Sequence, residues 1–76
     1  MQYTVFQVKG YLSICGLIPN ATQGVFEQWV GTYNGKEVAI HLCISETHVP
    51  QFSIDSIIKE LNDTKEKFNQ IVSVIK

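Results

Sequence analysis

The sequence contains no arginine: all six basic residues are lysines, set against seven acidic residues. Arginine supplies the planar fork that reads guanine edges and clamps phosphates. Its absence, together with a net charge close to zero, argues against a nucleic-acid-binding protein. The lysines near the C-terminus alternate with acidic residues, a pattern typical of a solvated helix face rather than of a basic stripe.

Cysteine is also scarce, because only Cys15 and Cys43 occur. A small secreted domain usually carries more cysteines, since disulfides compensate for its thin core. We therefore expect two buried thiols and no disulfide. The sequence also shows neither the basic and apolar start of a signal peptide nor an apolar run that could cross a bilayer. The expected location is the cytoplasm of a bacterium or of a phage-infected cell, without membrane attachment.

Motifs that carry chemistry are missing as well. The sequence has no glycine-rich phosphate loop, and its glutamates are too dispersed to form an acid–base pair. His41 and Cys43 are two residues apart on a predicted strand, about 6.6 Å, which is too far for a Cys–His nucleophile. Together with His48 and Cys15 they match no compact zinc-binding spacing. These observations predict a protein that is not an enzyme and that has no metal or cofactor.

The strongest local signal that is present is Asn34-Gly35, which stands between two runs of alternating apolar residues. Asn-Gly favours the type I′ turn of a two-residue hairpin, because both central residues need a positive φ. We predict strands over residues 25–33 and 36–46. The turn fixes the register of the hairpin, and the register decides on which face of the sheet each side chain lies.

The N-terminal third is predicted to form a second hairpin. Residues 2–8 and 11–18 are rich in β-branched and aromatic side chains, which favour strands, and Lys9-Gly10 would be the turn between them. Residues 19–24 have the composition of a loop.

The C-terminal third is predicted to be helical, with Ser53 as the N-cap and Phe52 packed against Ile57. Its apolar residues recur at the i, i+3, i+4, i+7 spacing of an amphipathic helix: Ile54, Ile57, Ile58, Leu61, Phe68, Ile71, Val72 and Ile75. The stripe lapses at residues 62–64. One long helix is preferred, and two short helices with a bend at Asn62 are the alternative. The predicted fold is a single α+β domain over residues 1–76, with an antiparallel four-stranded sheet and one C-terminal helix on one face.

The hairpin register gives the sheet two different faces. The large aliphatic side chains share one face, the natural bed for the helix: Val25, Trp29, Val38, Ile40, Leu42 and Ile44. Glu27 falls on this face too, and we expect it to lie at an edge or to pair with a lysine. Gly31, opposite Val38, leaves room for the helix to approach closely.

The second face is expected to be open, because a helix about 10 Å wide cannot cover both faces of a sheet roughly 19 Å across. Its predicted apolar residues come from both hairpins: Phe6, Val8, Tyr11, Cys15, Leu17, Phe26, Val30 and Cys43. A contiguous apolar face exposed to water usually marks an interface. The alternative is that residues 2–18 are shifted in register by one, or that residues 19–24 fold over this face.

Residues 29–40 read Trp-Val-Gly-Thr-Tyr-Asn-Gly-Lys-Glu-Val-Ala-Ile and precede the C-terminal amphipathic helix. This arrangement resembles a family of small bacterial domains of unknown function, some of which are immunity proteins encoded beside toxins. The resemblance covers residues 25–75 and leaves out the N-terminal third. It implies a non-catalytic binding role and supplies no site residues.

These observations predict a small protein that binds and inhibits another protein, such as a toxin-immunity protein or a phage inhibitor of host defence. Aromatic anchors inside a polar rim are the usual layout of a binding hot spot. The predicted contact residues are Phe6, Tyr11, Phe26, Gln28, Val30 and His41. The alternatives are a homodimer that packs two sheets face to face, a nucleic-acid-binding module that uses the helix lysines, and a small-ligand sensor between sheet and helix.

Overall fold

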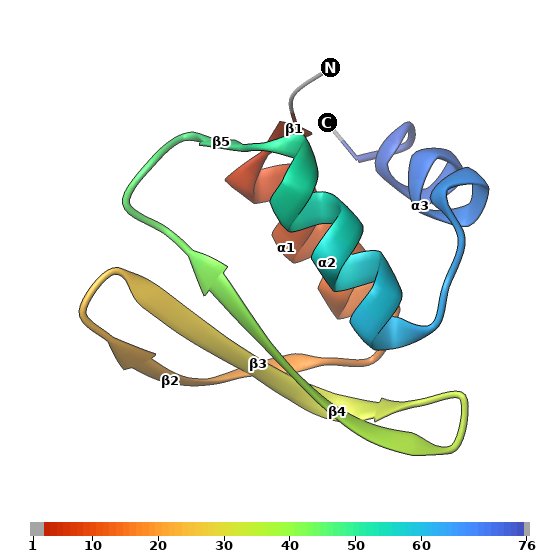
Figure 1. Cartoon of the computed structure of the whole chain (residues 1–76), viewed down its shortest axis with the longest axis horizontal. Helices are drawn as coiled ribbons and strands as arrows, with labels where there is room; N and C mark the ends of the chain where they lie inside the picture. The colour runs from red at the N-terminus through yellow and green to blue at the C-terminus, as the bar shows by residue number, and fades with distance from the viewer. Residues whose placement is uncertain (1–2, 76) are drawn as a thin grey trace.

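The structure is a computed structural model that describes residues 3–75. It shows an α+β fold in two main layers. Along the chain the elements are β1 (Tyr3–Thr4), α1 (Val5–Ile14), β2 (Ile18–Gln23), β3 (Phe26–Tyr33), β4 (Lys36–Cys43), β5 (His48–Val49), α2 (Gln51–Leu61) and α3 (Lys65–Val72). Figure 1 shows α1 and α2 on the same side of the sheet formed by β2, β3 and β4, with α3 farther from the sheet. None of the helices formed by residues 3–75 is long and apolar enough to cross a membrane.

The central hairpin of β3 and β4 confirms the prediction. Antiparallel pairing runs without interruption from Phe26 opposite Cys43 to Tyr33 opposite Lys36. Asn34 and Gly35 have φ values of 55° and 77°, the positive values that the tight turn requires. The predicted register is therefore correct, although β4 ends at Cys43 and not at residue 46.

The predicted N-terminal hairpin is wrong, because residues 5–14 form the helix α1. A capping box starts this helix: the Thr4 hydroxyl accepts from the Gln7 amide at 3.1 Å, and the Gln7 side chain accepts from the Thr4 amide at 3.0 Å. The buried residues follow the i, i+3, i+4, i+7 spacing of a helix: Val8, Tyr11, Leu12 and Cys15. The stripe is buried and the cap satisfies backbone groups at the start of the helix. Together these two contributions to stability outweigh the β-propensity of the individual residues.

Residues 18–23, most of which were predicted to be a loop, form the edge strand β2. All its side chains are exposed, so no alternation of buried and exposed residues marks it as a strand. Pairing with β3 is interrupted by a bulge between Pro19 and Ala21. The main sheet therefore has three strands in the order β2-β3-β4, and a separate two-stranded ribbon joins β1 to β5. The predicted four-stranded sheet with a single helix is replaced by these two sheets and three helices.

The C-terminal helical segment is broken at Asn62, so the alternative with two helices is the correct one. Asn62 has a φ of 56° and is the C-cap of α2, a left-handed conformation in which an α-helix ends. Thr64 then begins α3, since its hydroxyl accepts from the Lys67 amide at 3.2 Å. The chain turns here, and α3 packs against α1 and α2.

The start of α2 also differs from the prediction. The helix begins at Gln51 with Pro50 as its N-cap. Proline suits this position because its fixed φ fits the start of a helix and because the N–H that it lacks would have no partner within the helix. Ser53 is thus inside the helix. Phe52 is 74% exposed and does not staple the helix to Ile57.

The core lies between the sheet and the helices, and the predicted inner face of the hairpin is confirmed. From the sheet the core takes Trp29, Val38, Ile40 and Leu42. Glu27, on the same face of the central strand, is half-buried; it accepts a hydrogen bond from the Trp29 indole at 2.8 Å and lies 3.5 Å from the Lys9 ammonium. Of the two expectations for Glu27, the lysine partner is therefore the correct one.

Candidate protein-binding site

The outer face of the sheet, turned away from the helices, gathers most of the predicted contact residues. Phe26 pairs with Cys43, Gln28 with His41 and Val30 with Ala39, so their side chains all lie on this face. Strand β2 adds residues paired with them, and Figure 1 shows no helix on this side of the sheet. We define the outer face as Ile18, Ala21, Gln23, Phe26, Gln28, Val30, Thr32, Glu37, Ala39, His41 and Cys43.

The outer face combines apolar and polar side chains around Phe26. Phe26 is 48% exposed and Ile18 63% exposed, while Gln28 and Val30 are half-buried and His41 is exposed. A hollow of about 470 Å³ lies beside Phe26 and is bounded by Ala21, Gln23, Gln28 and His41.

Two predicted contact residues do not lie on this face. Tyr11 is fully buried in the core, where its ring packs edge-on against Phe68 at 4.7 Å between centroids. Phe6 is 62% exposed but belongs to α1 in the other layer of the fold. Both were misplaced because residues 5–14 are helical and not extended. For the same reason Val8, Cys15 and Leu17, which were also predicted on the open face, are buried in the core.

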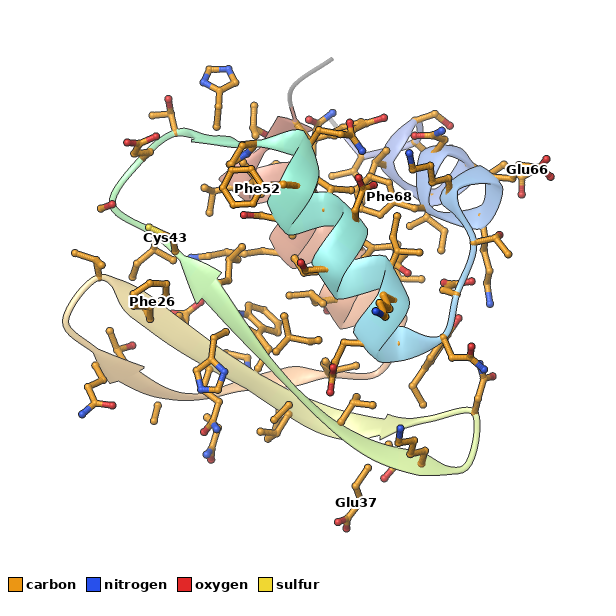
Figure 2. All side chains as sticks on the ribbon, in the orientation of Figure 1. Phe26, Glu37, Cys43, Phe52, Glu66 and Phe68 are labelled. Atoms are coloured by element: carbon orange, nitrogen blue, oxygen red, sulfur yellow. The ribbon has the colours of Figure 1, made fainter. Side chains whose placement is uncertain are left out.

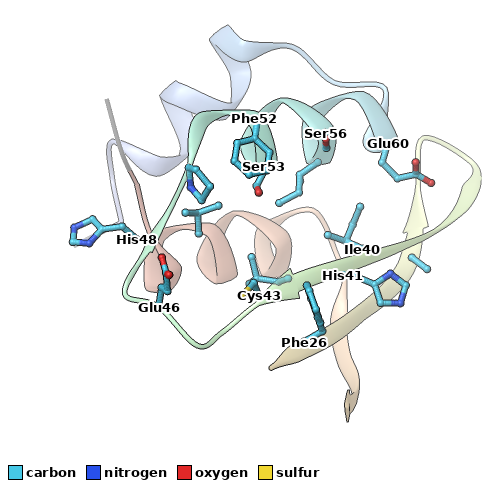
Figure 3. Close-up of a pocket in the computed structure, with 15 residues that line it drawn as sticks. Phe26, Ile40, His41, Cys43, Glu46, His48, Phe52, Ser53, Ser56 and Glu60 are labelled. Atoms are coloured by element: carbon cyan, nitrogen blue, oxygen red, sulfur yellow. The ribbon is translucent and has the colours of Figure 1, made fainter. Parts of the chain in front are cut away.

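A second recess, which the sequence did not reveal, runs between β4 and α2 and has a volume of about 720 Å³. We call it the β4 groove and define it by Phe26, His41, Cys43, Phe52, Ser56 and Glu60. Figure 3 shows Phe52, Ser53, Ser56 and Glu60 on the wall formed by α2, opposite Phe26, His41 and Cys43. Phe26 and His41 border both recesses, so the groove and the hollow of the outer face meet at β4.

One signal for the groove was present in the sequence. Phe52, Ser56 and Glu60 follow each other at intervals of four, which places them along one side of α2. This side borders the buried stripe of the helix without belonging to it. Phe52 was instead predicted to pack against Ile57, whereas Figure 2 shows it standing out from the start of α2.

Charge in the β4 groove is of one sign. Glu46 lies in the loop between β4 and β5, and Glu60 lies on α2, whereas none of the lysines within residues 3–75 lines the groove. The two histidines of the lining, His41 and His48, are both exposed. The groove is thus an apolar channel with carboxylates among the residues of its lining.

A polar cluster on the other side of the molecule holds the layers together. Tyr11 donates to the Asp63 carboxylate at 2.6 Å and Tyr33 donates to the same oxygen at 3.1 Å, while the Lys67 ammonium donates to the Tyr33 hydroxyl at 2.6 Å. Burial raises the pKa of Asp63, but the hydrogen bonds and the nearby ammonium outweigh burial and hold that pKa below its usual range. Burial also raises the pKa of the Cys15 thiol and of the Tyr11 phenol. The cluster joins α1, the end of β3, the connection between α2 and α3, and α3 itself.

Both cysteines are free: Cys15 is buried and Cys43 is half-buried in the β4 groove. Within residues 3–75 no group of three or more His, Cys, Asp or Glu side chains is placed to hold a metal ion.

Comparison of the chain with protein-family models, with curated proteins and with solved structures gives no match in any of the three. The features available for a functional assignment are therefore the α+β fold, the outer face and the β4 groove.

Proposed function

We propose that this chain is a non-catalytic protein that binds another protein through the outer face and inhibits it. The observation that carries the proposal is the uncovered outer face of the sheet. Within residues 3–75, no element packs on it, although it exposes Phe26 and Ile18 to solvent. Exposed apolar side chains gathered on one flat surface usually mark a protein interface.

The arrangement on the outer face supports this proposal. Phe26 and Val30 form an apolar centre along β3, and Gln28, Thr32 and His41 add polar groups around it. An apolar anchor with a polar rim is the arrangement in which a few residues supply most of the binding free energy. The anchor lies on a regular strand, so it is held in place before binding and loses little conformational entropy on association.

An inhibitory role fits a small domain whose most exposed surface is a rigid face rather than a cleft with reactive groups. We place the protein in the cytoplasm of a bacterium or a phage-infected cell, where a toxin-immunity protein or a phage inhibitor of host defence would act. Its action would be to cover the partner's functional surface.

The proposal is tested by site-specific photo-crosslinking in an extract of the cell that makes the protein. Benzoylphenylalanine replaces Gln28 on the outer face in one variant and Phe6 on α1 in a second. We expect a discrete cross-linked protein from position 28 and none from position 6. Phe26→Glu, introduced together with the probe at position 28, should abolish the cross-link, while Phe6→Glu, a matched change of a more exposed phenylalanine on another element, should leave it intact.

Three results would contradict the proposal. The first is equal cross-linking from both positions. The second is unfolding of Phe26→Glu, seen by circular dichroism, because it would make the outer face part of the core. The third is a homodimer, seen as a light-scattering mass of twice the 8.6 kDa chain that persists over a tenfold dilution. In that case the cross-links would form only between copies of the chain.

A further inference from the structure

The two edges of the main sheet are built differently. On β2, the residue Pro19 has no N–H to offer and a bulge interrupts the strand just after it. Proline and bulges are the features by which natural sheets prevent another strand from adding to an edge. Strand β4 has neither feature, since its pairing with β3 is unbroken over residues 36–43.

The free edge of β4 presents a regular series of backbone groups. Beyond the end of the strand, the Ile44 amide donates to the Val25 carbonyl at 2.7 Å, which fixes the phase of the antiparallel ladder. Because the ladder alternates, residues 38, 40 and 42 direct their N–H and C=O groups toward β3, and the residues between them direct theirs outward. The outward set is Glu37, Ala39, His41 and Cys43. Within the described part of the chain, no strand pairs with this edge.

The β4 groove lies directly beside this edge. A chain that hydrogen-bonds to β4 would direct every second side chain to the side of the sheet on which α2 lies. Phe52, Ser53 and Ser56 form the wall on that side (Figure 3). Phe52 is 74% exposed and is available to cover an apolar side chain of the added strand.

We infer that the β4 groove binds an extended segment of the partner protein, which adds to β4 as a fourth strand. Its apolar side chains would face α2, and lysine or arginine side chains would accompany them. This inference rests on the proposed function, because the segment would belong to the protein docked on the outer face. It deepens that function by naming the mode of recognition, which is strand addition.

Charge distinguishes this occupant from a second copy of the chain. The carboxylates of Glu46 and Glu60 line the groove, and among the described residues 3–75 no lysine joins them there. A basic segment complements that charge, whereas two copies paired through β4 would bring like charges together.

The test uses the full chain and a synthetic peptide of ten residues in which lysine and valine alternate, with blocked ends. Hydrogen exchange of individual amides is followed by NMR with and without the peptide. We expect slower exchange at Glu37, Ala39, His41 and Cys43, whose amides lie on the free edge. The amides of Val38, Ile40 and Leu42 already pair with β3 and should not change, so they are an internal control.

Two controls separate strand addition from attraction by charge or by apolar contact alone. N-methylation of the alternate peptide residues that pair with β4 should weaken binding at least about tenfold, and N-methylation of the intervening residues should not, because only the former donate to the edge. A peptide with glutamate in place of lysine should bind at least about tenfold more weakly.

A variant of the chain gives a second, independent readout. Ala39→Pro removes one outward N–H and leaves the ladder to β3 in place, so it should weaken peptide binding about tenfold. Thr22→Pro, the same change on the other edge of the sheet, is the matched control and should bind like the wild type. If Ala39→Pro does not fold, the methylated peptides decide the question on the wild-type chain.

Absence of protection at the four outward amides, or equal binding of the acidic peptide, would overturn the inference. If those amides are protected without peptide and the protection rises with protein concentration, the occupant is a second copy of the chain. That result would also overturn the inference. These measurements need no partner from the cell, and Gln28 lies outside the groove lining. If the peptide does not add to β4 but position 28 gives a specific cross-link, the inference alone is refuted. If the peptide adds to β4 but position 28 gives no specific cross-link, the proposed function alone is refuted.

Discussion

The carboxylate of Asp63 connects three parts of the chain. It accepts hydrogen bonds from Tyr11 of α1 and Tyr33 of β3, and it is followed directly by the N-cap of α3. Because both tyrosines donate to an ionised group, these bonds are stronger than bonds between neutral partners. The sequence indicated local roles for Asp63 at the break in the helical stripe, a capping box with Glu66 and a pair with Lys67, but it did not indicate the two tyrosines, which lie 30 and 52 residues away.

We expect Asp63→Asn to lower the free energy of unfolding by about 1–2 kcal/mol at pH 7, because charge-assisted hydrogen bonds become neutral ones. The folded-state pKa of Asp63 lies below its unfolded value. Its stabilisation is therefore present above about pH 4, the range of an unperturbed aspartate, and is lost as the pH falls through the folded-state pKa. Urea unfolding of both proteins between pH 7 and pH 3 should show the two stabilities converging at low pH.

Asp55→Asn, which removes an exposed carboxylate, is the control and should leave the urea midpoint at pH 7 nearly unchanged. If the stability of Asp63→Asn runs parallel to that of the wild type over the whole pH range, the role assigned to the Asp63 carboxylate is wrong.

Gly31 is a residue whose lack of a side chain is required by packing. A Cβ at this position would lie 2.8 Å from the Gly16 carbonyl oxygen and 3.0 Å from the Leu17 Cα, and both are backbone atoms. The close approach expected at Gly31 is thus present, but the neighbour is the segment between α1 and β2 and not the C-terminal helix. We expect Gly31→Ala to cost about 2 kcal/mol of unfolding free energy, because backbone must shift to admit the methyl group.

Gly10→Ala is the matched control for this prediction, measured by the same urea titration. A Cβ at Gly10 would lie 2.7 Å from the Ile75 Cδ1, which is the end of a flexible side chain that can move away. Alanine is also favoured over glycine in a helix by about 1 kcal/mol, so the net change should be small. Equal losses in the two variants would show that the clash at Gly31 is not the cause.

At the scale of elements, α1 shows what a pattern of residue types can and cannot predict. Two signals for a helix were present, the Thr4–Gln7 capping box and the buried stripe that begins at Val8. They were obscured because Phe6 and Ile14, on the exposed side of the helix, are apolar as well. Apolar residues on all sides remove the amphipathic contrast that identifies a surface helix.

The break between α2 and α3 depends on the backbone of Asn62. With a φ of 56°, this residue is in a conformation that glycine and asparagine adopt at low cost and alanine does not. We expect Asn62→Ala to lower the unfolding free energy by about 1 kcal/mol and Asn62→Gly to change it by no more than a few tenths. Gln70→Ala, at an exposed site within α3, is the control for loss of an amide side chain. Equal stability of the alanine and glycine variants at position 62, measured by thermal unfolding, would contradict the role of the left-handed cap.

At the scale of the whole molecule, the sequence predicted the parts of the fold that local turn chemistry determines. Asn34-Gly35 fixed the β3–β4 register, and with it the inner face that packs under the helices and the outer face with Phe26, Gln28, Val30 and His41. Strand β2 could not be predicted in the same way, because it is exposed on both sides and is held by backbone pairing to β3. The β4 groove depends on how α2 lies beside the sheet. The spacing of Phe52, Ser56 and Glu60 placed them on one side of α2, but nothing along the chain indicated that this side borders β4.

The contrast between the edge of β2, with Pro19 and its bulge, and the open edge of β4 limits how the protein can assemble. Open filaments grow when one surface of a molecule fits a different surface of the next, so that every addition exposes a new acceptor. Here the opposite edge of the main sheet, as described by residues 18–23, is interrupted by Pro19 and the bulge and does not match the regular edge of β4. Recruitment of a strand by β4, as inferred above, would therefore terminate after one event, and the expected complex contains one partner segment for each chain. An exposed sheet edge is usually a hazard for fibre formation, and an edge of this kind beside a blocked one would capture a single strand instead.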